Sequence, residues 1–320
     1  MTSASAPGKI ILFGEHAVVY HHPAVAVPIT QVHADVVIDH ALQPEKESPT
    51  VDEQPLSGIW IDAPDIFFHN KLSQLPTGSA LRCTIEAVLR ALQIDNPPQI
   101  KIKIKSSIPL ASGLGSGAAV SVALIRALSA HLDHPFNDAQ VNELCYEIEK
   151  IHHGTPSGID NTVITYARPV YFIKDQPIET LRVNTAFTIL VADTGIPAPT
   201  KESVGDVRKL WQANPTYWED VFDQVGEIAR HARHAIESGN WRRLGPLMDA
   251  NHALLQEMTV SSPELDLLVQ VAKTAGAEGA KLSGGGRGGN MIALVAPENA
   301  NDIATELQQA GARTIITTIQ

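Results

Sequence analysis

An alternating strand, a glycine-rich turn and a long apolar helix follow one another between residues 99 and 132, and this succession limits what the chain can fold into. Isoleucine and lysine alternate over 99–105, which predicts a strand with one buried face and one solvated face. The three lysines could form a basic patch, but a solvated face that discourages pairing at a sheet edge explains them better. Residues 118–132 are rich in Ala, Val and Leu, which predicts a helix.

The turn between them, Ser112-Gly-Leu-Gly-Ser-Gly117, has two interpretations that the residues leave open. Glycines let the backbone approach a ligand closely, and the first N–H groups and the dipole of a helix favour an anion, so the turn could cradle a phosphate. Alternatively, it is a tight turn that needs positive φ. It is not a Walker A loop, because no Lys-Ser/Thr pair follows. Asp133 has the spacing of the acidic residue in a dinucleotide-binding fingerprint, but it follows a helix and not a second strand.

Strands and helices intermix along the rest of the chain, so the fold class is α+β or α/β. Further strands are predicted at 9–13, 24–29, 34–38, 187–192, 280–282, 291–295 and 313–317. Helices are predicted at 79–92, 138–151, 217–238, 241–258, 263–275 and 300–310. A polar, proline-containing stretch at 41–57 predicts an exposed loop. The polar stretch at 174–185 predicts a boundary between two domains, 1–182 and 183–320.

The composition of the 320 residues excludes several classes of protein. With 24 Lys and Arg against 35 Asp and Glu, the net charge is −11, so the field of the molecule repels nucleic acids and anionic membranes. No stretch approaches 18 consecutive apolar residues, so we expect no membrane span. The two cysteines, Cys83 and Cys145, suggest neither a metal site nor a disulfide framework, which is typical of the reducing cytoplasm. We therefore expect a cytoplasmic protein without a nucleic-acid or membrane partner.

Two further segments contain candidate functional residues. Residues 283–290 hold five glycines in eight positions, and either a close backbone approach or a floppy connection would explain them. Ser157 and Asp160 have the spacing of a capping box. Taken alone, this spacing favours a helix-capping role for Asp160 over an acid–base role.

The predicted strand at 9–13 carries polar groups near its end. Lys9 shares a strand face with Ile11, where a lysine usually reaches out to solvent but could also be a fixed cation for a phosphate or carboxylate. Glu15 and His16 follow a glycine, which suggests that polar groups gather there. The remaining histidines offer no metal spacing, and no Gly-x-Ser-x-Gly elbow indicates acyl transfer.

Four segments in this order resemble the GHMP superfamily of galactokinases, homoserine kinases, mevalonate kinases and phosphomevalonate kinases. They are PGKIILFGEHAVVY at 7–20, IPLASGLGSGAAVSVAL at 108–124, HGTPSGIDNTV at 153–163 and KLSGGGRGGNMIAL at 281–294. Within the superfamily the chain is most similar to the mevalonate kinase family. Residues 17–20 (AVVY) stand where a galactokinase would have a sugar-binding threonine–aspartate pair, and a diphosphomevalonate decarboxylase would open with a different, tryptophan-bearing strand.

The resemblance implies an α+β, two-domain GHMP kinase fold. Its N-terminal, ATP-binding domain would be like the second domain of ribosomal protein S5, and its C-terminal domain would be a ferredoxin-like α/β sandwich. The implied activity is ATP-dependent phosphorylation of the 5-hydroxyl of mevalonate in isoprenoid biosynthesis. Mg²⁺ would be the cofactor, mevalonate and ATP the small-molecule partners, and a homodimer the oligomeric state.

The resemblance also implies roles for residues at matching positions. Asp160 would be catalytic and lie by the mevalonate hydroxyl with Lys9 close to it, a role that can coexist with capping. Ser116 and Glu149 would hold Mg²⁺. The mevalonate site would be lined by Lys9, Glu15, His16 and Thr200. The ATP phosphates would be bound by the two glycine-rich loops, through Pro109, Ala111, Ser112, Gly113, Leu114, Gly115, Ser116, Gly117, Ala118, Ala119, Gly285 and Gly286.

Three departures from the family pattern stand out. Gly117 occupies a position where a second serine is frequent, and residues 166–169 (YARP) replace an aromatic–Gly–Gly segment. In the second glycine loop, Arg287 stands where glycine is usual and Asn290 replaces a small residue. Arg287 could add a cation near phosphates or point to solvent.

Two other functions stay open. A related kinase of the superfamily could phosphorylate phosphomevalonate, the 3-hydroxyl of mevalonate or a sugar. A catalytically silent, ligand-binding regulator on the same fold is the alternative from another class. A catalytically silent relative commonly lacks at least one of the catalytic or metal-binding residues. This chain has all four, which argues against the regulator: Lys9, Ser116, Glu149 and Asp160.

Overall fold

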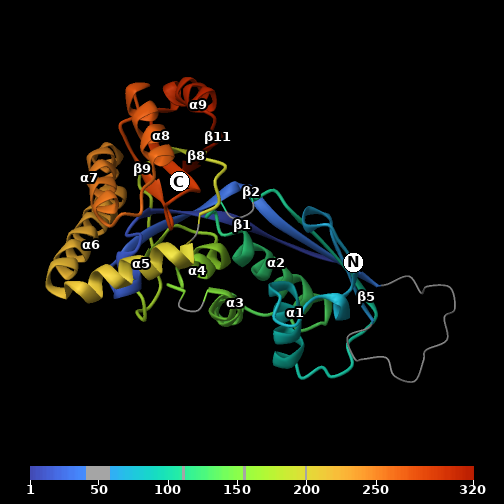
Figure 1. Cartoon of the computed structure of the whole chain (residues 1–320). Coiled ribbons are helices and arrows are strands. Elements are labelled where there is room, and N and C mark those ends of the chain that lie inside the picture. The colour runs from blue at the N-terminus through green and yellow to red at the C-terminus, as the bar shows by residue number, and fades with distance from the viewer. Residues whose placement is uncertain (41–57, 110–111, 154–155, 199) are drawn as a thin grey trace. The chain divides into compact units, whose positions relative to one another are not determined.

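The computed structural model describes residues 1–40, 58–109, 112–153, 156–198 and 200–320 (Figure 1). The chain divides into two compact units, each assembled from separated segments. The first unit comprises 1–8, 32–108 and 115–166, and the second comprises 9–31, 109–114 and 167–320. The domain boundary at 182–183 stays a prediction, and the predicted loop at 41–57 lies outside the described residues.

The first unit contains a sheet with the strand order β4-β3-β5-β2. Its strands are β3 (Ile59–Ala63), β4 (Phe68–Lys71), β5 (Ile100–Ser106) and the later part of β2 (Ala24–His40), and β2 also pairs with β1 (Thr2–Phe13). Strand β5 buries its isoleucines and exposes its lysines, as the alternation predicts. The lysines do not protect a sheet edge, however, because β5 lies between β3 and β2.

The α-helices of this unit, within the part of the chain that the structure describes, are α1 (Ala80–Ala91), α2 (Ser116–His131), α3 (Asp138–His153) and α4 (Ile159–Tyr166). Helix α2 contacts the other three helices and is buried on most of its surface. An apolar surface all round is what a central helix requires. The short 3₁₀ helices η2 (Pro64–Ile66) and η3 (Leu72–Gln74) complete the unit.

The second unit contains an antiparallel sheet with the strand order β11-β8-β10-β9. Its strands are β8 (Phe187–Asp193), β9 (Gly279–Ser283), β10 (Asn290–Val295) and β11 (Arg313–Ile319). Helices separate β8 from β9 and β10 from β11, so the chain follows the β-α-β-β-α-β order of a ferredoxin-like sandwich. The expectation for the C-terminal part of the chain is confirmed.

Among its described residues the second unit has five α-helices, and α7, α8 and α9 contact the strands of its sheet. They are α5 (Thr200–Ala213), α6 (Pro215–Glu237), α7 (Leu244–Glu257), α8 (Pro263–Thr274) and α9 (Ala300–Gln309), with 3₁₀ helices η1 (Ala17–Tyr20), η4 (Trp241–Arg243) and η5 (Pro297–Asn299). The helix predicted at 241–258 begins its α-helical part only at Leu244, close to Pro246, which suits a first turn but not a helix interior.

Strand β2 joins two stretches that the sequence predicts as separate strands. Its residues 24–26 pair with β6 (Val170–Phe172), which pairs in turn with β7 (Glu179–Thr180), whereas its residues 34–40 pair with β5. Pro28 lies outside both ladders, so its missing N–H costs neither of them a hydrogen bond.

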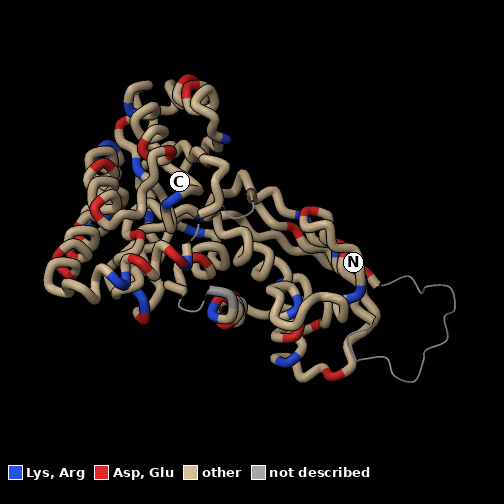
Figure 2. The backbone as a smooth tube through the Cα atoms, in the orientation of Figure 1, with Lys and Arg blue, Asp and Glu red and all other residues tan. Residues whose placement is uncertain are grey.

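The core of the second unit lies where its helices pack on its sheet, and Phe222, Leu255, Leu282, Met291 and Ile303 are all fully buried there. Figure 2 shows basic and acidic positions interspersed along the outer helices of this unit. Within the described ranges, no helix has the length and the apolar character that crossing a bilayer requires.

Candidate active site

A sharp turn after β1 directs Glu15 and His16 into the interior of the second unit. Gly14 has φ 98°, and a Cβ atom there would lie 2.5 Å from the backbone of Ala24, so the close approach requires glycine. His16 itself has φ 61°, a conformation that is uncommon for a residue with a side chain. Both polar side chains are buried, so polar groups do gather at the end of the strand.

Glu15 forms a buried ion pair with Lys281 of β9. Both side chains are fully buried, and Lys281 also donates a hydrogen bond to the carbonyl of Leu282. Burial raises the pKa of Glu15, an effect that the neighbouring ammonium group partly offsets. Removing one partner of such a pair would leave a buried charge without compensation, so the pair holds the turn after β1 against β9.

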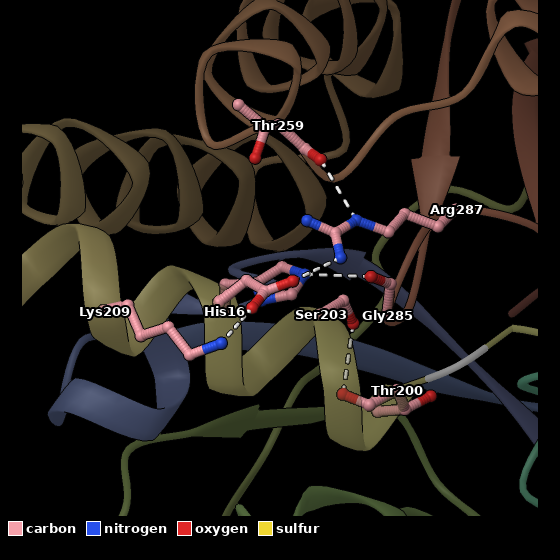
Figure 3. Close-up of polar contacts among 8 residues, drawn as sticks. His16, Thr200, Ser203, Lys209, Thr259, Gly285 and Arg287 are labelled. Atoms are coloured by element: carbon pink, nitrogen blue, oxygen red, sulfur yellow. Dashed lines mark hydrogen bonds and ion pairs between the residues drawn. The ribbon is translucent and has the colours of Figure 1, made fainter.

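His16 is held by the second glycine loop. Its Nε2 atom donates a hydrogen bond to the carbonyl oxygen of Gly285 at 3.2 Å (Figure 3). Burial lowers the pKa of His16 to about 4, and the positive charges of Arg287 and Lys281 act in the same direction. The imidazole is therefore neutral near pH 7, and its Nδ1 atom is an acceptor. That buried atom has no hydrogen-bond partner among the residues that the structure describes.

Close approaches of neighbouring residues, and not a flexible connection, explain the glycines of the second loop. A Cβ atom on Gly285 would lie 2.7 Å from Oγ1 of Thr200, the first residue of α5, and one on Gly286 would lie 1.9 Å from the carbonyl oxygen of Val260. The loop thus packs tightly against the start of α5 and against the segment after α7. His16 and Thr200 both contact Gly285, so two predicted substrate residues meet at one point of the loop.

Ser112 lies in the part of the first glycine turn that belongs to the second unit, and it contacts the second glycine loop. The side-chain amide of Asn290 donates to the carbonyl oxygen of Ser112 at 2.5 Å, and Gly289 approaches the same carbonyl. Ser112 in turn donates to the carbonyl oxygen of Pro109, at 2.9 Å. The second loop therefore supports this part of the first turn through Asn290. The predicted residue Ala111 lies outside the described residues.

Lys9 is only 3% exposed, so it does not reach out to solvent as a strand lysine usually does. Its backbone N–H donates to the carbonyl oxygen of Leu114 at 2.9 Å, which joins β1 to the first glycine turn. Of the two interpretations of Lys9, burial favours the fixed cation.

In the first unit, the glycine turn continues into the start of α2. Gly115 has φ 77° and precedes Ser116, the first residue of the helix. The turn therefore needs positive φ, and within the described residues no side chain caps the helix. The first N–H groups of α2 have no partner within the helix, which is the arrangement that favours an anion. The turn thus has the positive φ of a tight turn and also a helix start that suits an anion, so its geometry is compatible with both interpretations.

In the first unit, Glu149 and Asp160 both act electrostatically on the thiol of Cys145. Burial raises the pKa of that thiol, and the negative charges of the two carboxylates raise it further, so both lie within electrostatic reach of one sulfur atom. The thiol contacts the carbonyl oxygen of Ala118 in the first turn of α2, at 3.8 Å. Three predicted segments, the helix start, Glu149 and Asp160, therefore come together.

Asp160 lies half-buried in the first turn of α4. The predicted capping box stays a prediction, and α4 begins at Ile159. The hydroxyl of Ser157 accepts from the N–H of Ile159, at 3.3 Å. The hydroxyl thus satisfies one N–H group at the helix start.

Ser116 and Glu149 provide the kinds of donor that Mg²⁺ accepts in proteins, namely a hydroxyl and a carboxylate. Glu149 is 8% exposed, and a Cβ atom on Gly117 would lie 3.9 Å from its Oε1 atom, so the carboxylate lies beside the start of α2. Across the described part of the chain, no group of three or more His, Cys, Asp and Glu side chains is arranged as a metal site. The pair fits a magnesium ion that arrives with a nucleotide, whose phosphates and water would complete the coordination.

Lys281 is a buried residue of the site for which the sequence predicts no role. A lone lysine between Ala280 and Leu282 in an apolar strand is nevertheless a signal for a buried charge. That charge needs a partner, and Glu15 after the glycine of the first motif is the corresponding lone acid.

Comparison with known proteins identifies the family. A model described as the GHMP kinases N terminal domain matches residues 79–168, and one described as the GHMP kinases C terminal matches residues 232–313. The chain belongs to the GHMP kinases. Both family models fit the two-domain fold that the resemblance implies.

Individual members of the GHMP kinases extend this similarity over nearly the whole chain. Mevalonate kinase from Pyrococcus furiosus is 36% identical, over 99% of this chain and 95% of that protein. Mevalonate kinase from Saccharolobus solfataricus is 31% identical over 93% and 91%. Among solved structures, L. major mevalonate kinase in complex with R-mevalonate is 30% identical, with a TM-score of 0.83 over 100% of this chain and 96% of that one.

Proposed function

We propose that this GHMP kinase is an ATP-dependent mevalonate kinase that phosphorylates the 5-hydroxyl of mevalonate. The observation that carries the proposal is the 36% identity to a mevalonate kinase over nearly the full length of both chains. The chain is accordingly a phosphotransferase with an alcohol acceptor. The site geometry supports phosphoryl transfer, because two carboxylates gather near an uncapped helix start in the first unit.

In the proposed reaction, the first glycine turn and the start of α2 bind the phosphates of ATP, supported by Gly285 and Gly286. Backbone N–H groups at a helix start bind phosphate well, and such binding needs glycine where the backbone approaches the ligand. Ser116 and Glu149 hold Mg²⁺, which neutralises phosphate charge when it is bound with the nucleotide. This chain's residues otherwise act by positioning.

The chemical step moves one phosphoryl group. The oxygen of the mevalonate hydroxyl forms a bond to the γ-phosphorus of ATP, the bond from that phosphorus to the β–γ bridging oxygen breaks, and ADP leaves. The transition state is loose, so the hydroxyl proton can leave late. Asp160 orients the hydroxyl and receives its proton, and Lys9 stabilises the charge that develops on the two oxygens.

The acceptor is held by His16, Thr200 and Lys9. The unpaired Nδ1 atom of neutral His16 can accept a hydrogen bond from a hydroxyl of the substrate. Glu15 was also predicted as a substrate residue, but its buried pairing with Lys281 favours a supporting role behind His16.

An assay of ADP release tests the proposal, with Mg-ATP and a panel of mevalonate, phosphomevalonate, galactose and homoserine. We expect turnover with mevalonate alone. Phosphorus NMR of the product distinguishes the hydroxyls, because a phosphate on the primary 5-hydroxyl couples to two adjacent protons and one on the tertiary 3-hydroxyl does not. Turnover with phosphomevalonate alone would contradict the proposal, and tight ATP binding without any turnover would favour the silent regulator.

Three finer features rest on the resemblance and belong to the same proposal. Mg²⁺ as the metal is tested by titrating the metal against turnover. A homodimer is tested by sedimentation, and a cytoplasmic location by fractionation.

A further inference from the structure

Arg287 departs from the family pattern in the second glycine loop, and its surroundings suggest why. Its φ of 59° lies in the left-handed region, which glycine adopts more easily than any residue with a side chain. A residue with a long cationic side chain at such a position needs compensating contacts. The structure contains three of them.

The backbone and the guanidinium group of Arg287 connect the loop to the segment after α7 and to α5. Figure 3 shows the contact between the guanidinium group and Thr259. Its backbone N–H donates to the carbonyl oxygen of Val260 at 2.8 Å. The Nε atom donates to the carbonyl oxygen of Thr259 at 3.3 Å, and Nη1 donates to Oδ2 of Asp206 on α5 at 2.6 Å. The loop is thereby tied to the segment after α7 on one side and to α5 on the other.

The ion pair with Asp206 is partly shielded from water. The side chains of Arg287 and Asp206 are 29% and 37% exposed. Hydrogen bonds from Lys209 and Arg287 lower the pKa of Asp206 to about 2, so its carboxylate is charged at any ordinary pH. Lys209 contacts the same carboxylate at 2.8 Å but lies on α5 itself and is well exposed. Of the two cations, only Arg287 connects the helix to the loop.

The loop residue that Arg287 holds in place is Gly285, two positions earlier. Gly285 accepts the hydrogen bond of His16 through its carbonyl oxygen and packs against Thr200 at the start of α5. A shift of α5 relative to the loop would therefore move the two substrate residues apart. Because Nε and Nη1 are already engaged, the guanidinium group is better placed to hold protein segments than to bind a phosphate directly.

We propose that Arg287 is a positioning residue that clamps α5 and the second glycine loop together, so that His16 and Thr200 hold the acceptor substrate in one fixed geometry. The proposal rests on the proposed function for the identity of that substrate. The clamp itself depends only on contacts within the second unit.

The test compares R287G with K209A, R287K and D206A. Glycine suits φ 59°, so R287G removes the guanidinium group without adding backbone strain. K209A is the matched control, because it removes the other cation of Asp206 and leaves the loop untouched. R287K keeps the positive charge, but a lysine lacks the planar guanidinium group that donates to both Thr259 and Asp206. We therefore expect R287K to be more active than R287G but less active than wild type.

For R287G and D206A, we expect kcat/KM for mevalonate to fall about tenfold or more through a rise in KM, since small misplacements of binding groups are costly. The Tm should stay close to wild type, and the R287G/D206A double variant should be no worse than either single one. K209A should behave as wild type. An R287G enzyme with unchanged KM for mevalonate, or one that matches K209A, would overturn the clamp.

Amide hydrogen exchange separates this proposal from the proposed function. Without the clamp, we expect the amides of 283–290 to exchange about tenfold faster in R287G than in wild type, and not in K209A. This measurement needs no substrate. If wild type did not phosphorylate mevalonate, the proposed function would fail while exchange would still decide on the clamp, and unchanged exchange in R287G would overturn it.

Discussion

At the scale of single residues, burial decides the protonation state of the polar side chains around the second glycine loop. His16 is kept neutral by burial and by two nearby cations, and its Nε2–H is committed to Gly285. Its Nδ1 atom has no partner among the described residues and therefore remains as an acceptor for a ligand. Lys281 and Glu15 compensate each other's charge behind it. The same neighbourhood would be unstable if any one of these groups changed its charge.

The buried His16 should make stability depend on pH. Its pKa is lowered from 6.5 to about 4 in the folded state, so the unfolded chain binds the proton more tightly. Above pH 6.5, neutral His16 makes its full contribution to the free energy of unfolding. This contribution is lost as the pH falls from 6.5 through 4, and it amounts to about 3 kcal/mol. Wild type should lose that much more than His16→Asn in urea unfolding between pH 7 and pH 4.

Asparagine is the chosen replacement because it tolerates the left-handed conformation of His16. The other histidines with lowered pKa, among them His22 and His252, are common to both proteins and cancel in the comparison. Equal pH dependence in the two proteins would show that His16 does not titrate in this way.

Asp160 should be the most sensitive residue for turnover. Asp160→Asn keeps the size of the side chain but cannot receive the proton of the hydroxyl, so kcat should fall about 10²–10⁴-fold. Asp138→Asn is the matched control, because Asp138 also lies in the first turn of a helix, where it pairs with Arg126 at the surface. Steady-state kinetics at equal Tm measure both. A kcat of Asp160→Asn within about tenfold of wild type would refute the catalytic role.

At the scale of elements, close backbone approaches set how the helices of the second unit pack on its sheet. Helix α7 and strand β9 meet through Gly245 and Gly279, and a Cβ atom on Gly279 would lie 2.2 Å from the carbonyl oxygen of Gly245. No real Cβ contact is that short, so a side chain there must displace one element. Strand β9 also carries Lys281, so this packing supports the buried ion pair with Glu15.

Gly279→Ala should therefore destabilise the protein by about 1–3 kcal/mol or more, since the added methyl group overpacks the contact with α7. Gly205→Ala on α5 should instead stabilise the protein. No atom of the described residues lies within 4 Å of a Cβ at Gly205, and alanine in a helix is better than glycine by about 1 kcal/mol. Urea unfolding measures both changes. Similar effects of the two substitutions would contradict the role of the close approach.

At the scale of the whole molecule, a net charge of −11 opposes the binding of ATP and of an anionic acceptor. The chain offsets this field locally. Lys9 is a buried cation of the second unit, and the start of α2 is the proposed anion site of the first. Magnesium on the nucleotide would reduce the remaining repulsion.

Binding of the nucleotide should therefore stabilise the folded chain only when the metal is present. At a concentration of Mg-ATP 100 times its Kd, mass action contributes about 2.7 kcal/mol, which thermal unfolding detects as a higher Tm. EDTA or Glu149→Gln should remove most of this gain. Glu147→Gln, which changes an exposed acid on the same helix that pairs with Lys150, should keep it. A full gain in Glu149→Gln would exclude Glu149 as a metal ligand.

The sequence alone predicted the elements whose pattern is local, and it predicted the family from the order of four motifs. Alternation in β5 and the apolar length of α2 depend on neighbours a few residues away, whereas the glycines of the second loop follow from close approaches to Thr200 and Val260. Helix α5 and the short strands β3, β4, β6 and β7 were missed, because two to five residues carry too little periodicity and α5 is largely polar.

Only the tertiary structure decided which polar groups meet. Glu15 and Lys281 are 266 positions apart, and His16 and Gly285 are 269 apart, so no local pattern relates them. Burial of Lys9 and the clamp of Arg287 on Asp206 likewise depend on the elements that pack around them. A side chain's charge and partners follow from its solvent exposure, and exposure is fixed only when distant segments of the chain pack together.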